Sequence, residues 1–334
     1  MHATRGPRIT HVTRVTAAVL LPLAALTLAL TACAPSFTAY RTAATAPHRP
    51  YDVRPLLHPP KKYFGVFRPG APHSMEPVHD WARMVGKRPN LIAYYAGWGD
   101  GFDAKGMRDA WNSGALTVMS WEPHDTTLTR IADGAFDEYI RGCAKAVRAL
   151  SFPLAISFAD EMNGDWEQWG TTGTTPKEYV RAWRHIHDAF QDAGATNVIW
   201  TWSPNILRPG THQDLSAYYP GDSYVDWVGL VGYFTDWDPH SFTGLFGSTL
   251  SEIKRFTQKP RLILETGAMP GRHRKEDVRT LFDGVTAARD IIGFAWFDHK
   301  ARADWRLAAN PEGVAEFRRL SANDLYGFDV RSAR

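Results

Sequence analysis

The chain has 334 residues, of which 44% are hydrophobic and 22% are charged, a composition typical of a soluble globular protein. Its formal net charge of +3 is too small to indicate a nucleic-acid partner. Aromatic residues are numerous, with 13 Trp, 12 Tyr and 17 Phe. Many of them follow apolar runs, at the places where strands are expected to end.

Residues 1–32 have the pattern of a secretory signal, in which a basic segment precedes an apolar run. The run is short for a membrane-spanning helix and contains Pro22. It ends in Leu-Thr-Ala-Cys, which resembles a bacterial lipobox and implies cleavage before Cys33 and lipidation of its thiol. An ordinary signal peptide and an uncleaved anchor are the alternatives. We therefore expect an extracellular protein, anchored by lipid to the outer face of the cell membrane.

Residues 33–60 are rich in Pro, Ala and Thr, and we expect an extended tether there. Residues 61–322 are predicted to form one folded domain, followed by a C-terminal tail over residues 323–334. Cys143 lies on the apolar face of a predicted helix, which favours a buried structural thiol. If Cys33 is lipidated, no disulfide can form within the chain.

Eight apolar runs recur along the predicted domain, and several are separated by helical patterns. They span residues 63–67, 91–95, 116–121, 154–158, 197–202, 225–231, 261–264 and 291–296. Strands that are apolar throughout and alternate with helices predict a parallel sheet covered on both faces. Eight such units in about 260 residues predict an α/β fold of the single (β/α)8 TIM-barrel type. An open doubly wound sheet is the alternative, but no glycine-rich phosphate-binding motif follows the first run.

Polar and aromatic side chains follow these runs, at the barrel end where enzymes of this fold carry their chemistry. Glu161 follows the fourth run and Glu265 the seventh, so the two would face each other across the barrel mouth. Paired carboxylates on either side of a bond perform glycoside hydrolysis, one as nucleophile and the other as proton donor. The alternative is that these acids cap loops or pair with Arg and Lys.

A set of short motifs resembles family 26 of the glycoside hydrolases, the family of β-mannanases with some β-glucanases and xylanases. The motifs are Phe-Ala-Asp-Glu-Met-Asn-Gly-Asp-Trp at 158–166, Trp-Ser-Pro-Asn at 202–205, Tyr-Pro-Gly-Asp at 219–222, Val-Asp-Trp-Val-Gly at 225–229, Lys-Pro at 259–260 and Glu-Thr-Gly at 265–267. The resemblance covers residues 63–320. It implies a (β/α)8 barrel and a retaining double displacement.

By position, the resemblance implies that Glu161 is the acid/base and Glu265 the nucleophile. It also implies that Tyr233 donates a hydrogen bond to the nucleophile, and that Trp166 and Trp296 form walls of the sugar subsites. The chain departs from the family at Asp160, where a histidine is usual. An aspartate there adds negative charge beside Glu161 and is expected to raise a carboxyl pKa, so it bears on substrate preference.

Four further residues at the predicted strand ends are candidates for substrate binding. Trp98 and Trp121 could be platforms for sugar rings or parts of the core. Glu122 could accept a hydrogen bond from a sugar hydroxyl or form an ion pair, and Asn205 could bind a hydroxyl or stabilise a turn. The histidines show no metal-binding spacing, so we expect neither a metal nor a cofactor.

The sequence therefore predicts a monomeric, retaining glycoside hydrolase acting on a β-linked polysaccharide, most similar to endo-β-1,4-mannanases. Activity on β-1,3-1,4-glucan, on xylan or on the organism's own exopolysaccharide is an alternative within the same chemistry. A surface lipoprotein that binds glycans without cleaving them is an alternative of a different class.

Overall fold

The computed structural model describes residues 51–208 and 213–333. The predicted signal, Cys33 and most of the predicted tether lie outside the described residues. Within the described residues, no helix is both long enough and apolar enough to span a membrane.

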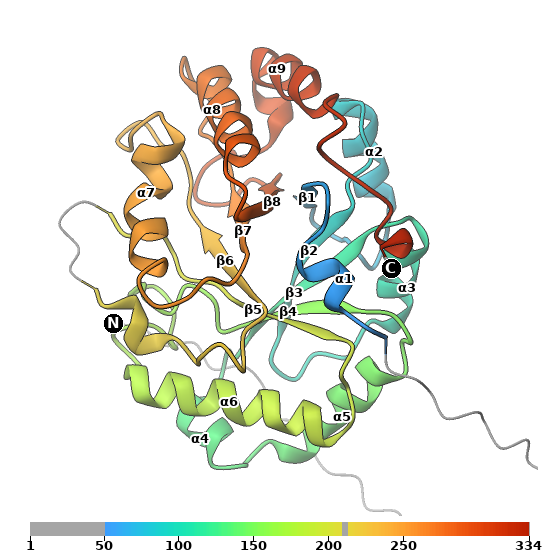
Figure 1. Ribbon diagram of the computed structural model, residues 1–334, viewed down its shortest axis with the longest axis vertical. Helices are drawn as coiled ribbons and strands as arrows, with labels where there is room; N and C mark the ends of the chain where they lie inside the picture. The colour runs from blue at the N-terminus through green and yellow to red at the C-terminus, as the bar shows by residue number, and fades with distance from the viewer. Residues whose placement is uncertain (1–50, 209–212, 334) are drawn as a thin grey trace, which may run out of the picture. The chain divides into compact units, whose positions relative to one another are not determined.

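Eight parallel strands close into a barrel in which each strand pairs with its neighbours in chain order (Figure 1). They are β1 (Tyr63–Phe67), β2 (Leu91–Gly97), β3 (Leu116–Glu122), β4 (Leu154–Phe158), β5 (Val198–Trp202), β6 (Trp227–Val231), β7 (Arg261–Thr266) and β8 (Ile291–Phe297). All eight predicted strands are present, and the closed barrel confirms the predicted fold class rather than the open sheet.

Helices surround the barrel as an outer layer (Figure 1). In chain order after β1 they are α2 (Glu76–Val85), α3 (Ala104–Asn112), α4 (Leu128–Ala132), α5 (Asp137–Arg148), α6 (Pro176–Asp192), α7 (Phe242–Ile253), α8 (Arg274–Ala287) and α9 (Pro311–Ser321). The longest, α6, begins with a capping box in which Thr175 and Glu178 satisfy each other's backbone N–H groups. Side chains that are apolar on one face of each helix then pack against the barrel.

The strand side chains divide into two hydrophobic clusters, because successive residues of a strand point to opposite faces. One cluster, which includes Leu91, Ala93 and Ala295, fills the barrel interior. The other, which includes Tyr94 and Trp296, lies between the barrel and the helices. Which cluster a residue joins decides whether it can reach the barrel mouth.

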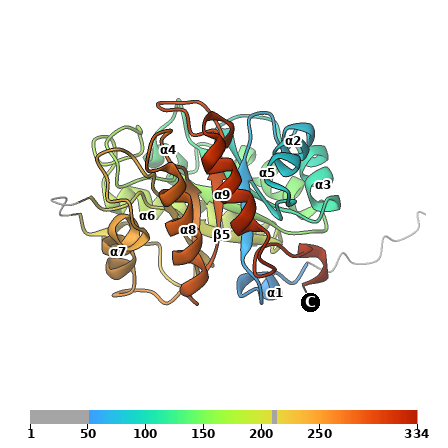
Figure 2. The same cartoon turned by 90° about the horizontal axis from the view of Figure 1, so that it is seen from above.

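The predicted boundaries of the tether and the tail are wrong over residues 51–60 and 323–333. The short helix α1 (Arg54–Leu57) lies beside the C-terminal residues at one end of the barrel (Figures 1 and 2). Leu56 and Val330 are fully buried in the interior cluster, and the Trp227 indole N–H donates to the Leu57 carbonyl oxygen at 3.2 Å. An open barrel end exposes apolar residues, and these two segments cover them.

Candidate active site

The backbone turns sharply where β4 ends. Ala159 has φ +48° and Glu161 has φ +54°, a left-handed conformation that is uncommon for residues other than glycine. Neighbouring strands hold this turn, because the Ala159 N–H donates to the Trp121 carbonyl and the Glu161 N–H donates to the Ser203 carbonyl. Such strain persists where the surroundings impose it, often at functional sites.

Two neutral donors hold the Glu161 carboxyl group. The Trp166 indole N–H donates to one oxygen at 3.1 Å, and the Asn205 amide donates to the other. Asn205 is itself fixed by Asn163, through hydrogen bonds of 2.8 and 3.0 Å between the two residues. Asn205 therefore positions Glu161. Asn205 and Trp166, the two donors to Glu161, both line a hollow of about 240 Å³ beside that carboxyl group.

Two phenols hold the Glu265 carboxyl group at the end of β7. The hydroxyl of Tyr233 donates to one oxygen and that of Tyr95 to the other. Tyr233 lies where the sequence predicted it, whereas Tyr95 was missed. The alternation of Leu91, Ala93 and Tyr95 along β2 could have identified it, since all three point into the barrel.

The two carboxyl groups interact electrostatically and are both removed from water. Burial, followed by the negative charge of Glu161, raises the pKa of Glu265 to about 7, although the two phenols oppose the rise. Burial likewise raises the pKa of Glu161 against the hydrogen bonds from Asn205 and Trp166. Because each charge disfavours the other, the pair retains a proton to a higher pH than isolated carboxylates do.

Asp160 lies beside this pair and is only 5% exposed. Its Oδ1 atom has no hydrogen-bond partner within the described residues. Burial, followed by the charges of Glu122, Glu161 and Glu265, raises its pKa well above the usual range. Burial and these neighbouring charges therefore disfavour the ionised form of the Asp160 carboxyl group, and with it the negative charge that the sequence led us to expect.

Glu122 belongs to the same cluster of acids at the end of β3. Its carboxylate is 3.0 Å from Nε2 of His124, and burial raises its pKa. Its charge also acts on Asp160 and Glu265. The position of Glu122 is thus compatible with both predicted roles. It can form an ion pair with His124 when that ring is protonated, and it faces the barrel mouth, where a sugar hydroxyl could donate to it.

Trp296 is wrongly predicted as a wall of the sugar subsites. It is fully buried, its indole donates to the Trp305 carbonyl oxygen, and its ring packs against Phe317 of α9. It points outward from β8, while its neighbour Phe297 points inward. The rings that pack beside Tyr233, the donor to Glu265, are those of Phe297 and Trp305, whose centroids lie 5.9 and 4.4 Å from that of Tyr233.

Trp98 and Trp121 belong to the core and are not sugar platforms. Trp121 is 2% exposed, and the two indoles stack on each other at 4.8 Å between the barrel and α5. Trp121 lines a cavity of about 490 Å³ together with Tyr94, Met119 and Cys143.

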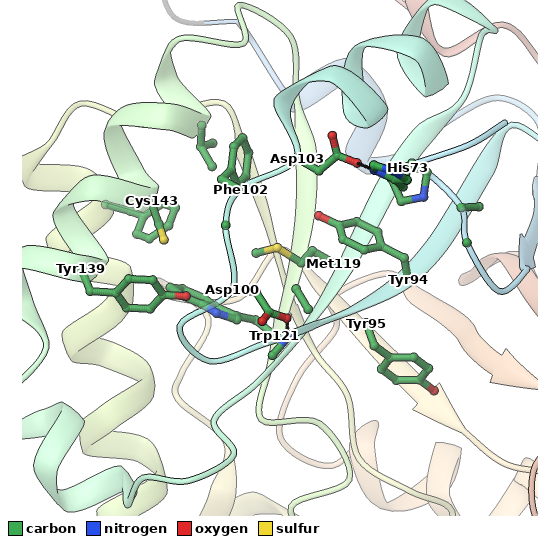
Figure 3. Close-up of a pocket in the computed structure, with 18 residues that line it drawn as sticks. His73, Tyr94, Tyr95, Asp100, Phe102, Asp103, Met119, Trp121, Tyr139 and Cys143 are labelled. Carbon is green, nitrogen blue, oxygen red and sulfur yellow. Dashed lines mark hydrogen bonds and ion pairs between the residues drawn. The ribbon is translucent and has the colours of Figure 1, made fainter. Parts of the chain in front are cut away.

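That cavity lies on the outer side of β2 and β3. Tyr95 also borders it, but Figure 3 shows its ring turned away from that of Tyr94. Neither Glu161 nor Glu265 lines this cavity. It is therefore separate from the paired carboxyl groups. The Cys143 thiol is partly buried on α5, and burial raises its pKa.

The described residues contain no cluster of three or more His, Cys, Asp or Glu arranged to hold a metal ion. His240 and His273 do lie together, with their rings stacked at 3.9 Å, but His240 pairs with Asp277 at 2.8 Å.

Comparisons with known proteins agree with this architecture. Residues 130–270 match the model of "Glycosyl hydrolase family 26". Endoglucanase H of Acetivibrio thermocellus is 27% identical over 263 residues, which are 75% of this chain and 29% of that protein. A mannan endo-1,4-beta-mannosidase of Bacillus subtilis is 32% identical over 150 residues, which are 43% of this chain and 36% of that protein.

Solved structures of GH26 enzymes have the same fold. The catalytic domain of the GH26 endo-beta-1,4-mannanase of Bacillus sp. JAMB-750 aligns with a TM-score of 0.63 at 18% identity, covering 82% of this chain and 88% of that one. The GH26 beta-mannanase BoMan26A of Bacteroides ovatus aligns with a TM-score of 0.63 at 17% identity, covering 82% and 92%.

The chain spans about a third of the length of these curated relatives. The matched segment contains both Glu161 and Glu265, and the barrel around it has the fold of the solved members. The chain is therefore similar to glycosyl hydrolase family 26 over residues 130–270 and shares the barrel fold of its solved members.

Proposed function

We propose that the protein is a retaining glycoside hydrolase that cleaves a β-linked polysaccharide by double displacement. The observation that carries this proposal is the pair of buried, electrostatically coupled carboxyl groups of Glu161 and Glu265 at the barrel mouth. A glycosidic bond between two such groups can be attacked by one and protonated by the other.

The family resemblance assigns Glu265 as the nucleophile, and its contacts support this role. Two phenol hydroxyls donate to it, and hydrogen bonds to a carboxylate favour its charged form. Glu161 is assigned as the acid/base. Its burial raises its pKa, which favours the protonated form that must donate to the leaving oxygen.

After protonation by Glu161, the leaving sugar departs and Glu265 holds the glycosyl group as an ester. Glu161, now ionised, then removes a proton from water, which attacks the anomeric carbon and releases Glu265. Asn205 and Trp166 keep the Glu161 carboxyl group oriented in both steps.

The proposed substrate is a mannan that is cleaved at internal glycosidic bonds, since several similar proteins are named mannan endo-1,4-beta-mannosidases. Other relatives are named endoglucanase and beta-1,3-xylanase, so mixed-linkage glucan and xylans are the alternatives to test. A digestion panel of these polysaccharides, with analysis of product lengths, separates them and distinguishes endo from exo cleavage.

The catalytic assignment is tested with two alanine variants. Glu265→Ala should abolish turnover, and Glu161→Ala should lower it by roughly 100- to 10,000-fold. Azide added to Glu265→Ala should give a glycosyl azide of inverted configuration, and NMR of the first wild-type product should show retained anomeric configuration.

Near-normal activity of both variants would refute the assignment, and an inverted wild-type product would refute the double displacement. If no polysaccharide in the panel yields reducing ends but calorimetry detects glycan binding, the protein is a glycan-binding relative without catalysis.

We also propose that Cys33 carries a lipid that holds the protein on the outer face of the membrane, on the sequence pattern alone. A labelled fatty acid should be incorporated by the wild type and not by Cys33→Ala; equal labelling of both would refute it.

A further inference from the structure

The β6–α7 loop and the β7–α8 loop run side by side away from the paired carboxyl groups. The Phe234 N–H donates to the Gly267 carbonyl, and the Met269 N–H donates to the Phe234 carbonyl, each at 2.9 Å. Tyr233 and Glu265 lie where these loops begin. The paired loops therefore form a continuous path from Glu265 to the edge of the barrel rim.

At that edge, residues 236–240 and 271–273 enclose a hollow of about 830 Å³, which we call the rim hollow. Trp237 lines it and is 71% exposed, while the only other large exposed apolar side chain of the described residues is Trp166, at 41%. Within the part of the chain that the structure describes, no hydrogen bond or ring contact involves the Trp237 indole. Its faces are open to a ligand.

Polar groups of both signs surround this indole. Asp236 and Arg272 are exposed, and the Asp236 carboxylate approaches Gly271 of the opposite loop. Arg272 donates to Nε2 of His273 at 2.7 Å. The His273 ring stacks on His240, and Asp277 holds His240. The polar side of the hollow is thus fixed by a chain of contacts.

An exposed aromatic face beside fixed hydrogen-bonding groups suits a neutral sugar ring. The C–H face of a pyranose can lie on the indole while its hydroxyls meet the carboxylate and the guanidinium. Because acidic and basic groups both line the hollow, its charge does not favour a strongly anionic ligand. The open indole and the connection to Glu265 point to a sugar of the chain that is being cleaved.

We propose that the rim hollow is a distal subsite that binds a sugar unit of the polysaccharide, with Trp237 as its stacking platform. The polysaccharide then crosses the barrel mouth from Trp166, beside Glu161, to Trp237. This inference rests on the proposed function for the identity of the ligand.

Affinity electrophoresis tests the subsite without requiring hydrolysis. The Glu265→Ala protein, with or without Trp237→Ala, is run in native gels that contain galactomannan, glucomannan, mixed-linkage β-glucan or xylan. At least one polysaccharide should retard the parent protein, and Trp237→Ala should weaken its apparent affinity by about three- to tenfold. Trp237→Tyr keeps an aromatic face and should retain most of the retardation, whereas Arg272→Ala should reduce it.

In the otherwise wild-type enzyme, Trp237→Ala should lower kcat/KM for the polysaccharide by a similar factor. It should leave hydrolysis of a short aryl glycoside unchanged, since that substrate does not reach the rim. Equal retardation of the parent and Trp237→Ala proteins, or no retardation of the parent by any of the four polysaccharides, would overturn the subsite. Retardation that depends on Trp237, without release of reducing ends by the wild type, would instead refute only the proposed hydrolysis.

Discussion

Burial and hydrogen-bond donors shift the pKa values of the two carboxyl groups in opposite directions. Burial raises both pKa values, while donors from Tyr95 and Tyr233 on one side and Asn205 and Trp166 on the other lower them. The balance keeps the pKa of Glu265 at about 7. Each donor can therefore be tested through the pH dependence of the rate.

Tyr95→Phe should move the acidic limb of the kcat/KM profile to higher pH. The phenol favours ionised Glu265, so its loss raises the Glu265 pKa and leaves less of the proposed nucleophile ionised at a given pH. The shift should be about one pH unit, since a hydrogen bond to a charged group contributes roughly 1.5 kcal/mol and one pKa unit is about 1.4 kcal/mol. An unmoved limb would show that Tyr95 does not act on the nucleophile.

Asp160→Asn should stabilise the fold at pH 7 by about 1–3 kcal/mol, because the amide needs no proton to enter the site. Because the pKa of Asp160 is raised on folding, the folded state binds more protons at this site than the unfolded chain does between the unfolded and the folded pKa. That penalty is absent below the unfolded pKa of about 3.9 and grows as the pH rises toward the folded pKa. Urea unfolding at pH 7 and at about pH 4 should show the gain only at the higher pH.

Asp298 provides the matched control. It is equally buried but pairs with Arg68 and accepts the Leu307 N–H, so Asp298→Asn should destabilise the protein. A gain for Asp160→Asn that is the same at both pH values would contradict the protonation argument.

At the scale of elements, the two faces of a strand separate packing from function. On β8, Ala295 and Phe297 point into the barrel, while Phe294 and Trp296 pack against the helices. On β3, Trp121 points outward and its neighbour Glu122 lies in the acidic cluster. A tryptophan at a strand end is therefore available to a sugar only on the inward face or on the loop that follows.

Trp296→Ala should lower the free energy of unfolding by about 3–5 kcal/mol, as expected when a large buried side chain is deleted. The folded fraction should keep the wild-type KM. Trp166→Ala, which removes an exposed ring that donates to Glu161, should have the converse effect and lower activity with little change in stability. Chemical unfolding and steady-state kinetics on both variants check this. A raised KM in Trp296→Ala alone would show that Trp296 is a wall of a sugar subsite after all.

At the scale of the whole molecule, opposite ends of the barrel have different tasks. One end carries Glu161, Glu265 and the rim hollow. The other is closed by α1 and the C-terminal residues, which bury Leu56 and Val330 with the interior cluster. Segments at the two ends of the domain thereby stabilise the same barrel.

Leu56→Ala should destabilise the folded domain by about 2–5 kcal/mol, although it lies at the barrel end away from the carboxyl groups. The control is Arg54→Ala on the same short helix, whose exposed side chain pairs with Asp52 and should change stability by no more than about 0.5 kcal/mol. Thermal unfolding compares the two. Equal stability of both variants would mean that α1 does not close the barrel in solution.

The pattern of apolar runs and helices was sufficient to predict the eight strands and their closure. The same pattern placed Glu161 and Glu265 at strand ends, because the burial of a parallel strand is visible in its composition and its end is marked by the first polar residues. Local chemistry likewise explains the start of α6, where Thr175 caps the helix and Pro176 is its first residue.

Only the tertiary structure decided which side chains at those strand ends share the site. Tyr95 reaches Glu265 from β2, a separation of 170 residues along the chain, and such a contact depends on closure of the barrel. Trp121 and Trp296 occupy the outward face because side-chain direction depends on strand register, which composition does not specify. Likewise, residues 51–60 were predicted as tether because they continue a segment rich in Pro, Ala and Thr, and only the open end of the barrel gives their apolar side chains a surface to bury.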